Sequence, residues 1–205
     1  MKSKAKFLTL EGVDGAGKST CIKFIKKYFL GKNFNYVFTR EPGGTLLGEK
    51  LREILLHDKM EPETETLLMF SARNEHIHQI IKPNLKAGLI VVSDRFTDAT
   101  FAYQSGGKYV QKEKINILKN WVHEDLKPDL TLLFDLPVDV SLSRLNSDGN
   151  LDKFEKEAAD FHTRIRESYL TLAKSEPKRF EIINSNQNIN IIEKEVYLAL
   201  DKLFL

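Results

Sequence analysis

A chain of 205 residues with 41% hydrophobic residues and a formal net charge of +2 can bury a substantial core. So small a net charge does not favour nucleic acid or a membrane surface as a partner, and no apolar run approaches the roughly 18 residues of a membrane span. The single cysteine, Cys21, excludes an internal disulfide, and the lysine-rich N-terminus lacks the apolar segment of a signal peptide. We therefore expect one cytoplasmic domain, residues 1–205, that binds neither nucleic acid nor membrane.

Short apolar runs alternate with longer segments of helical periodicity. Strands are expected at residues 7–10, 36–39, 89–92, 130–134 and 180–183. Helices are expected at 21–30, 46–57, 63–85, 112–124, 138–145, 154–172 and 189–203, and Pro83 should kink or end the third of them. A further helix passes through Ala102 and Tyr103 and is broken by Gly106 and Gly107. This alternation predicts an α/β fold of three layers, a five-stranded parallel sheet flanked by helices.

The stretch Gly12-Val13-Asp14-Gly15-Ala16-Gly17-Lys18-Ser19 fits the P-loop pattern G-x-x-x-x-G-K-[ST] and lies between an expected strand and an expected helix. Backbone N–H groups of such a loop face a β-phosphate, and the positive end of the helix adds to the anion site. The lysine reaches the β- and γ-phosphates, and the hydroxyl group holds Mg²⁺. A nucleotide-phosphate site is therefore expected here.

Polar side chains are expected at the carboxyl ends of four strands, where ligands of parallel sheets bind: Glu11, Arg40, Asp94 and Asp135. Asp94 has the position of the aspartate that helps to hold Mg²⁺ in P-loop enzymes, and the guanidinium of Arg95 matches phosphate geometry. A simple ion pair at the strand end is the alternative. Arg73 lies in an otherwise apolar helix and needs a partner, either a structural acid or an incoming phosphate. The guanine-reading motif Asn-Lys-x-Asp of GTPases is absent from the sequence.

Over nearly its whole length the chain resembles the bacterial thymidylate kinase family, nucleoside-monophosphate kinases of the P-loop class. The matching segments, in one collinear order, are residues 11–19, Arg40-Glu41-Pro42-Gly43-Gly44-Thr45, the helix with Phe70 and Arg73, Asp94-Arg95-Phe96 and Ala102-Tyr103-Gln104. Residues 151–155 resemble the family's lid, expected at about residues 145–156. The resemblance implies transfer of the γ-phosphoryl group of ATP to dTMP, giving dTDP and ADP for dTTP synthesis, by a Mg²⁺-dependent homodimer.

The resemblance also implies roles for single residues. It assigns ATP to Gly12, Gly15, Ala16, Gly17, Lys18, Ser19, Thr20 and Arg144, the last packing against adenine, and it assigns the metal to Ser19 and Asp94. It assigns dTMP to Asp14, Glu41, Pro42, Phe70, Arg73, Arg95, Thr100, Tyr103 and Gln104. It assigns catalysis to Asp14, Lys18, Arg40, Arg95 and Lys153.

Within the dTMP site, the resemblance implies that Phe70 stacks on thymine and that Thr100 and Gln104 face the base edge. Tyr103 blocks the space of a ribose 2′-hydroxyl group, and Arg73 and Arg95 clamp the acceptor phosphate. Each assignment has an alternative. Phe70 and Tyr103 are also suitable core aromatics, and the polar side chains of Thr100, Gln104 and Arg144 also suit a helix surface.

The expected lid departs from the family pattern, because Asp152-Lys153-Phe154-Glu155 stands where Asp-Arg-x-Glu is usual. We expect Lys153 to supply the lid charge, with help from Arg40. Two other functions stay open. A deoxynucleoside kinase would use Glu41 as a base but would leave the convergence of Arg73 and Arg95 without a reason. A regulatory nucleotide-binding module would fit the sparse lid, although the intact P-loop and Asp94 count against it.

Overall fold

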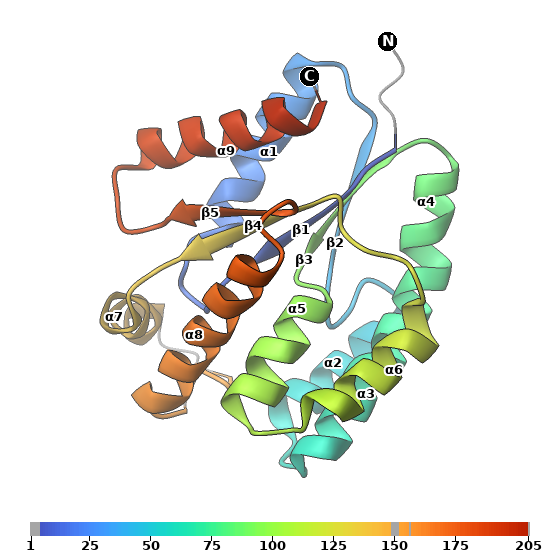
Figure 1. The fold of residues 1–205 in the computed structure, drawn as a ribbon, viewed down its shortest axis with the longest axis vertical. Helices are drawn as coiled ribbons and strands as arrows, with labels where there is room; N and C mark the ends of the chain where they lie inside the picture. Colours follow the sequence, from blue (N-terminus) through green and yellow to red (C-terminus); the bar gives the residue numbers. More distant parts are fainter. Residues whose placement is uncertain (1–4, 149–151, 156, 205) are drawn as a thin grey trace.

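The computed structural model describes residues 5–148, 152–155 and 157–204 (Figure 1). Five parallel strands form one sheet in the order β2-β3-β1-β4-β5. They are β1 (Phe7–Glu11), β2 (Tyr36–Arg40), β3 (Ile90–Asp94), β4 (Leu130–Asp135) and β5 (Phe180–Asn184). The predicted α/β fold with a five-stranded parallel sheet is confirmed, and each strand lies where the apolar runs predicted it.

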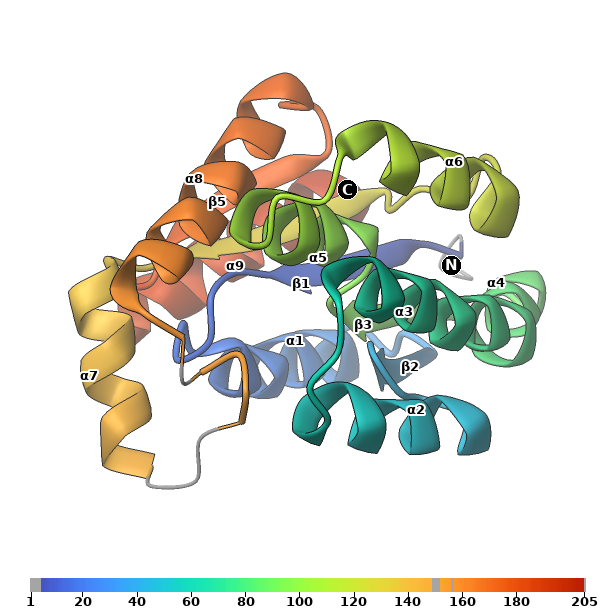
Figure 2. The same ribbon diagram turned by 90° about the horizontal axis from the view of Figure 1, so that it is seen from below.

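The sheet is covered on both faces, as Figure 2 shows, with α1 on one side and α5, α6 and α8 on the other. The α-helices are α1 (Lys18–Gly31), α2 (Leu46–His57), α3 (Pro62–His76), α4 (Lys82–Lys86), α5 (Thr97–Thr100), α6 (Lys112–His123), α7 (Val138–Asp148), α8 (Ala159–Ser175) and α9 (Ile189–Phe204). Two π-helical segments, η1 (Ile77–Ile81) and η2 (Phe101–Gly107), continue α3 and α5. The helix α9 packs beside α1 (Figure 1).

The central strand β1 anchors the helices through its alternating side chains. Leu8 and Leu10 belong to the cluster that contains Ile25 of α1, whereas Phe7 belongs to a second cluster with Ile77 of η1. Alternation of this kind follows from the two-residue period of a strand. Burial of each such side chain is worth roughly 1.5–3 kcal/mol. The packing of α1 on β1 holds the ends of the P-loop in place.

One helical prediction is confirmed and one requires correction. The helix expected at 63–85 is the continuous run of α3, η1 and α4, and Pro83 does not end it, because the backbone stays helical to Lys86. The helix expected from residue 154 begins at Ala159. Phe154 lies instead in a turn, where the backbone N–H groups of Phe154 and Glu155 donate to Asp152 Oδ1 at 2.8 and 3.0 Å.

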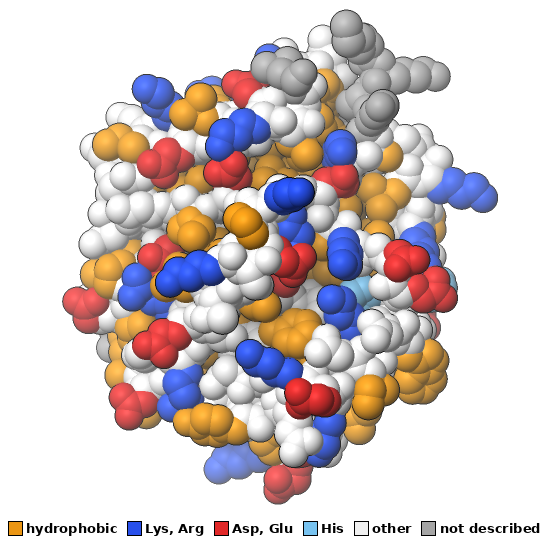
Figure 3. Space-filling model, in the orientation of Figure 1, with side chains coloured by type: hydrophobic (Ala, Val, Ile, Leu, Met, Phe, Trp, Pro, Cys, Tyr) orange, Lys and Arg blue, Asp and Glu red, His pale blue; other side chains and the backbone are white. Residues whose placement is uncertain are grey.

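The expected lid, at about residues 145–156, includes residues 149–151 and 156, which lie outside the described residues. Within the described part of the chain, none of the helices is long and apolar enough to cross a membrane. On the face shown in Figure 3, Lys and Arg side chains are interspersed with Asp and Glu, so that no large area of this face carries charge of one sign.

Candidate active site

The P-loop follows β1 directly, and α1 begins at Lys18, as the sequence predicts. Gly12 has a φ of 140°, and a Cβ atom there would lie 2.5 Å from the carbonyl oxygen of Phe134, so glycine alone fits beside β4. Lys18 Nζ donates to the carbonyl oxygens of Gly12 and Val13 at 3.1 and 3.0 Å. Burial and the nearby Arg95 lower the pKa of Lys18. The lysine is thus folded over the loop, beside the place where phosphates are expected.

A cavity of about 690 Å³, here called the P-loop cavity, opens beyond the carboxyl ends of the strands. Its lining includes residues 14–20 of the P-loop and Asp94 of β3, together with the four arginines Arg40, Arg52, Arg95 and Arg144. The positive charges of these side chains favour the binding of a polyanion in this cavity. Within the described residues, Asp94 Oδ1 is buried and has no hydrogen-bond partner. An unpaired carboxylate oxygen beside the exposed hydroxyl residue Ser19 suits a hard cation such as Mg²⁺.

A second cavity, here called the side cavity, lies next to the P-loop cavity and has a volume of about 90 Å³. Residues of the expected dTMP site line it: Asp14, Glu41, Pro42, Arg73, Arg95, Thr100, Tyr103 and Gln104. Its apolar lining comes from Leu56, Met69, Phe96, Ala99 and Phe154. The two cavities share Asp14, Glu41, Arg52 and Arg95. The site is therefore one bipartite depression with a charged boundary between its two halves.

Three side chains form a compact polar group at this boundary. The Tyr103 hydroxyl group donates to Asp14 Oδ2 at 2.7 Å and accepts a hydrogen bond from Arg95 Nη2 at 2.8 Å. Arg95 Nη2 also donates to Asp14 Oδ1. Burial would raise the pKa of Asp14, but the charges of Arg95 and Lys18 outweigh it and lower this pKa to about 2. Asp14 is therefore ionised near neutral pH and fixes both Arg95 and Tyr103.

The backbone around Arg95 is held in an unusual conformation. Arg95 has a φ of 69°, a value that costs a non-glycine residue about 1–2 kcal/mol. Its N–H donates to Leu10 O at 2.9 Å, its carbonyl oxygen accepts from Ser93 Oγ at 2.7 Å, and the N–H of Phe96 donates to Glu11 Oε1 at 2.7 Å. These three hydrogen bonds on consecutive groups fix the direction in which Arg95 leaves β3.

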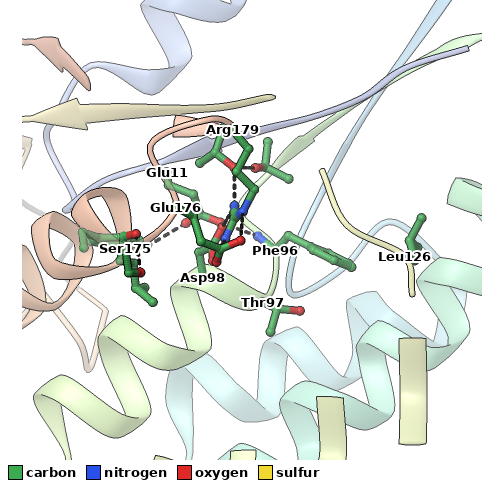
Figure 4. A network of polar contacts seen from close by, with 12 residues as sticks. Glu11, Phe96, Thr97, Asp98, Leu126, Ser175, Glu176 and Arg179 are labelled. Carbon is green, nitrogen blue, oxygen red and sulfur yellow. Dashed lines mark hydrogen bonds and ion pairs between the residues drawn. The ribbon is translucent and has the colours of Figure 1, made fainter. Parts of the chain in front are cut away.

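Glu11 and the start of α5 are part of a larger buried network (Figure 4). Glu11 Oε2 accepts from the Tyr169 hydroxyl group at 2.8 Å, and Arg179 binds both oxygens of Asp98 at 2.7 and 2.8 Å. Burial first, and the charge of Asp98 second, raise the pKa of Glu11 to about 8. The network ties β1, α5 and α8 together behind Arg95.

Arg73 is buried and makes several hydrogen bonds to groups of the protein itself. Its side chain is 2% exposed, and Nε donates to Glu41 Oε2 at 2.7 Å. Nη2 donates to Phe96 O at 3.1 Å and to Thr100 Oγ1 at 3.0 Å, while Nη1 is buried without a partner in the described part of the chain. The other oxygen of Glu41 is 2.8 Å from His76 Nδ1. Arg73 thus lines the side cavity next to Thr100, apart from the P-loop cavity.

Phe70 requires a correction. It is buried in a cluster with Phe101, Val110 and Ile115, and it is not among the described residues that line the side cavity. The neighbouring residue, Met69, lines that cavity instead. The core-aromatic alternative is therefore what the structure shows for Phe70. One position along a helix turns a side chain by about 100°, so an aromatic one residue away from the required position faces the core.

Lys153 also lies elsewhere than expected. Its Nζ is 2.9 Å from Glu65 Oε2 and 2.9 Å from Asp58 O, and it is absent from the described lining of the P-loop cavity. Glu65, a buried acid of α3, also binds Lys108 Nζ at 2.9 Å and Gln104 Nε2 at 3.0 Å. The lysine that we expected at the transferred phosphoryl group thus pairs with a buried acid that also contacts Lys108 and Gln104.

The remaining cations of the P-loop cavity come from two helices, α2 and α7, and from the end of β2. Arg40 pairs with Glu49 at 2.8 Å, and Arg144 donates to Gly15 O at 3.0 Å and to Ser185 O at 3.3 Å. Sequence reasoning missed Arg52, which donates to Pro42 O at 3.0 Å and lines both cavities. It missed Glu65 and His76 as well. All three lie on amphipathic helices, where charged residues are ordinary, so no sequence signal set them apart.

A protein-family model described as thymidylate kinase matches residues 10–196. The chain is 56% identical over 193 residues to the thymidylate kinase of Methylobacillus flagellatus, covering 94% of this chain and 95% of that one. It is 49% identical over 203 residues to the thymidylate kinase of Neisseria meningitidis serogroup B, covering 98% of each. A crystal structure of thymidylate kinase from Ehrlichia chaffeensis, 34% identical in sequence, matches with a TM-score of 0.78 over 96% of this chain and 98% of that one.

Proposed function

The chain belongs to the thymidylate kinase family, and from that premise we propose that it transfers the γ-phosphoryl group of ATP to dTMP, giving dTDP and ADP. The observation that carries the proposal is the shared boundary of the two cavities. ATP phosphates bound in the P-loop cavity and a nucleoside monophosphate bound in the side cavity would meet where Asp14, Arg52 and Arg95 line both. Phosphoryl transfer needs little from a protein beyond such positioning and charge stabilisation.

Lys18 and the P-loop backbone bind the β- and γ-phosphates of ATP in this proposal, and Arg144 lies near adenine. The acceptor phosphate binds to Arg95, whose direction is fixed by Asp14, Tyr103 and the hydrogen bonds of its backbone. No protein nucleophile is required, because an oxygen of the acceptor phosphate attacks. Arg40 and Arg52 provide further positive charge at the boundary.

Mg²⁺ would be held by Ser19 and Asp94 together with ATP phosphates. The buried Asp94 Oδ1 without a partner supports this assignment, as does the preference of Mg²⁺ for one or two carboxylates plus phosphates. When bound, the ion neutralises charge on the phosphates during transfer.

The base and sugar of dTMP would lie in the side cavity. Thr100, Gln104 and the unpaired Nη1 of Arg73 face the base edge, and Met69 contacts the base in place of Phe70. We assign Arg73 to the base and leave the phosphate to Arg95, because Arg73 is bound to Thr100 and Glu41. Tyr103 and Asp14 lie on the sugar side. A missing methyl group costs only about 1–3 kcal/mol, so dUMP should be a weaker substrate but not an excluded one.

The charge that the family's lid usually supplies is assigned here to Arg40 and Arg52. Both line the P-loop cavity, whereas Lys153 is paired with Glu65. An arginine acting on the transferred group is worth roughly 10³–10⁵ in rate. Replacement of Arg52 by methionine should therefore lower kcat far more than replacement of Lys153 by methionine. Equal losses, or a larger loss for Lys153→Met, would return the role to Lys153.

The proposed function is tested by ADP production from ATP and Mg²⁺ with each deoxy- and ribonucleoside monophosphate, and with thymidine, as the acceptor. We expect strong turnover with dTMP, weaker turnover with dUMP, and little with the others. Turnover with thymidine instead would identify a nucleoside kinase. ATP binding without turnover of any acceptor would favour a regulatory module.

We also propose that the protein is a homodimer joined through α3 and α6. Large apolar side chains are exposed on these helices: Leu67 is 54% exposed, Ile117 67% and Trp121 79%. Between the helices lies a largely apolar groove lined by Leu67, Val110, Ile117 and Leu118. An exposed apolar patch of this kind typically marks an interface.

The cytoplasm is the location that we propose, since Cys21 is a lone buried thiol.

A further inference from the structure

Glu65 is a carboxylate with no exposed surface, and its three partners come from two segments, η2 with the residue after it and the turn at residues 152–155. Its Oε2 atom lies 2.9 Å from Lys108 Nζ and 2.9 Å from Lys153 Nζ, while Oε1 accepts from Gln104 Nε2 at 3.0 Å. Ammonium groups are donors only, so Glu65 Oε2 is the acceptor for both lysines beside the side cavity.

A carboxylate surrounded by two ammonium groups acts as an acceptor, and this fixes the orientation of the Gln104 amide. If the amide were reversed, Gln104 Oε1 would face Glu65 Oε1, and two acceptors would be buried against each other. Gln104 is itself 1% exposed, so water cannot relieve that contact. The carbonyl oxygen and the second N–H of Gln104 are thus left for the side cavity, and no hydrogen bond from the described residues reaches Oε1.

This orientation matches one kind of pyrimidine edge. Thymine and uracil present the N3–H donor beside the O4 acceptor, which pair with the carbonyl oxygen and the N–H of a glutamine. Cytosine presents an N3 acceptor beside an amino donor, so both contacts would become repulsive. A site with fixed polar groups rejects a mismatched edge much more strongly than a site that can reorient.

We propose that Glu65 is a specificity-determining positioning residue: it holds the Gln104 amide in the orientation that accepts a thymine edge and refuses a cytosine edge. The proposal rests on the proposed function, because it needs dTMP in the side cavity. Glu65 touches no substrate and acts through Gln104. Its pairing with Lys153 gives that lysine a role in base selection.

The test compares dTMP with 5-methyl-dCMP, which carries the same methyl group and sugar but a cytosine edge. In Glu65→Gln the carboxylate becomes an amide that can pair with either orientation of Gln104. The ratio of kcat/KM for dTMP to that for 5-methyl-dCMP should fall by about tenfold or more. A ratio is independent of the fraction of folded enzyme, so partial misfolding does not affect it. Glu65→Asp keeps the carboxylate on a side chain that is shorter by one methylene group, so this variant should reduce the ratio less.

Glu193→Gln is the matched control, because Glu193 lies on α9, outside both cavities, and pairs with Lys27 at 2.9 Å. Its ratio should equal that of the wild type. In a Gln104→Leu background, Glu65→Gln should leave the ratio unchanged, since its effect passes through Gln104. An equal loss with both substrates in Glu65→Gln would show a merely structural role and overturn the inference. Failure of the wild type to phosphorylate dTMP would instead overturn the proposed function.

Discussion

The hydroxyl group of Tyr103 forms hydrogen bonds with both Asp14 and Arg95 at the boundary of the two cavities. Replacement of Tyr103 by phenylalanine removes hydrogen bonds to Asp14 and Arg95 and retains the ring. Hydrogen bonds to charged groups are worth about 1.5–3 kcal/mol, so kcat/KM for dTMP should fall roughly 10- to 100-fold. Discrimination between dTMP and ribothymidine monophosphate should stay unchanged, because the ring excludes the 2′-hydroxyl group.

Steady-state kinetics with the two nucleotides measure both expectations. Tyr109→Phe serves as the control, since Tyr109 is 73% exposed and lies outside both cavities. A loss of sugar discrimination in Tyr103→Phe, with dTMP turnover preserved, would mean that the hydroxyl group rather than the ring excludes ribose.

His123 should make stability depend on pH. Burial first, and the charge of Arg73 second, lower its pKa from 6.5 to about 4. His123 Nδ1 lies 3.0 Å from Leu126 O, and Nε2 lies 2.9 Å from Thr97 Oγ1, which suits a neutral ring that donates to the carbonyl and accepts from the hydroxyl. The unfolded chain takes up a proton below pH 6.5, whereas the folded one does so only near pH 4. Stability is therefore lost as pH falls through this window, by up to about 3 kcal/mol.

Urea unfolding of His123→Asn checks this expectation. The asparagine can still donate to Leu126 O but does not titrate, so the stability difference from wild type at pH 7 should shrink, or reverse, at pH 4.5. A constant difference for His123→Asn would contradict the lowered pKa.

Sequence reasoning at the residue scale placed a residue correctly where its position in a motif leaves few alternatives. Lys18 begins α1 and Asp94 ends β3, as the pattern predicts. It failed where the face of a helix decides the role. Phe70 and Met69 are adjacent and both apolar, and only packing shows that the methionine lines the cavity. Glu65 resembles its exposed neighbour Glu63 in sequence, although one is buried among lysines and the other lies in solvent.

At the scale of elements, the pair Gly106-Gly107 illustrates what local propensity cannot tell. The two glycines were predicted to break a helix, and they are the last two residues of η2, which ends at Gly107. A Cβ atom on Gly106 would lie 2.7 Å from Ser168 Cβ, and one on Gly107 would lie 2.5 Å from Phe161 Cε2. These glycines allow α8 to approach the segment that carries Tyr103 and Gln104. The reason for them is tertiary, so it is invisible in the sequence of η2.

Gly107→Ala should therefore destabilise the protein by about 1–3 kcal/mol, the usual effect of overpacking a core. The shift of η2 should also raise KM for dTMP more than it lowers kcat, because Tyr103 and Gln104 move with the helix. Gly31→Ala is the control: nothing lies within 4 Å of its added methyl group, and it should stabilise α1 by up to about 1 kcal/mol. Thermal unfolding and steady-state kinetics measure both variants, and a neutral Gly107→Ala would show that Phe161 moves freely.

At the scale of the whole molecule, the alternation of strands and helices was enough to predict a parallel sheet and to place the site beyond its carboxyl ends. The order of the strands was not predictable, because it depends on crossovers that local pattern does not encode. That order places β1 between β3 and β4, so that the P-loop lies between Asp94 and Phe134. In the expected lid, the position of Lys153 was not predictable, because this lysine pairs with Glu65, which lies 88 residues earlier in the chain.

The proposed dimer gives the last prediction. Ile117→Glu places a charge in the centre of the apolar surface on α3 and α6, where a partner could not solvate it. Light scattering should give the wild type about twice the chain mass of 23.6 kDa and the variant the chain mass alone. Leu198→Glu on α9, where leucine is 52% exposed, is the matched control and should stay dimeric. Because α3 also carries Glu65, Met69 and Arg73, dissociation should weaken dTMP binding as well; a wild type of monomer mass with full activity would exclude the interface.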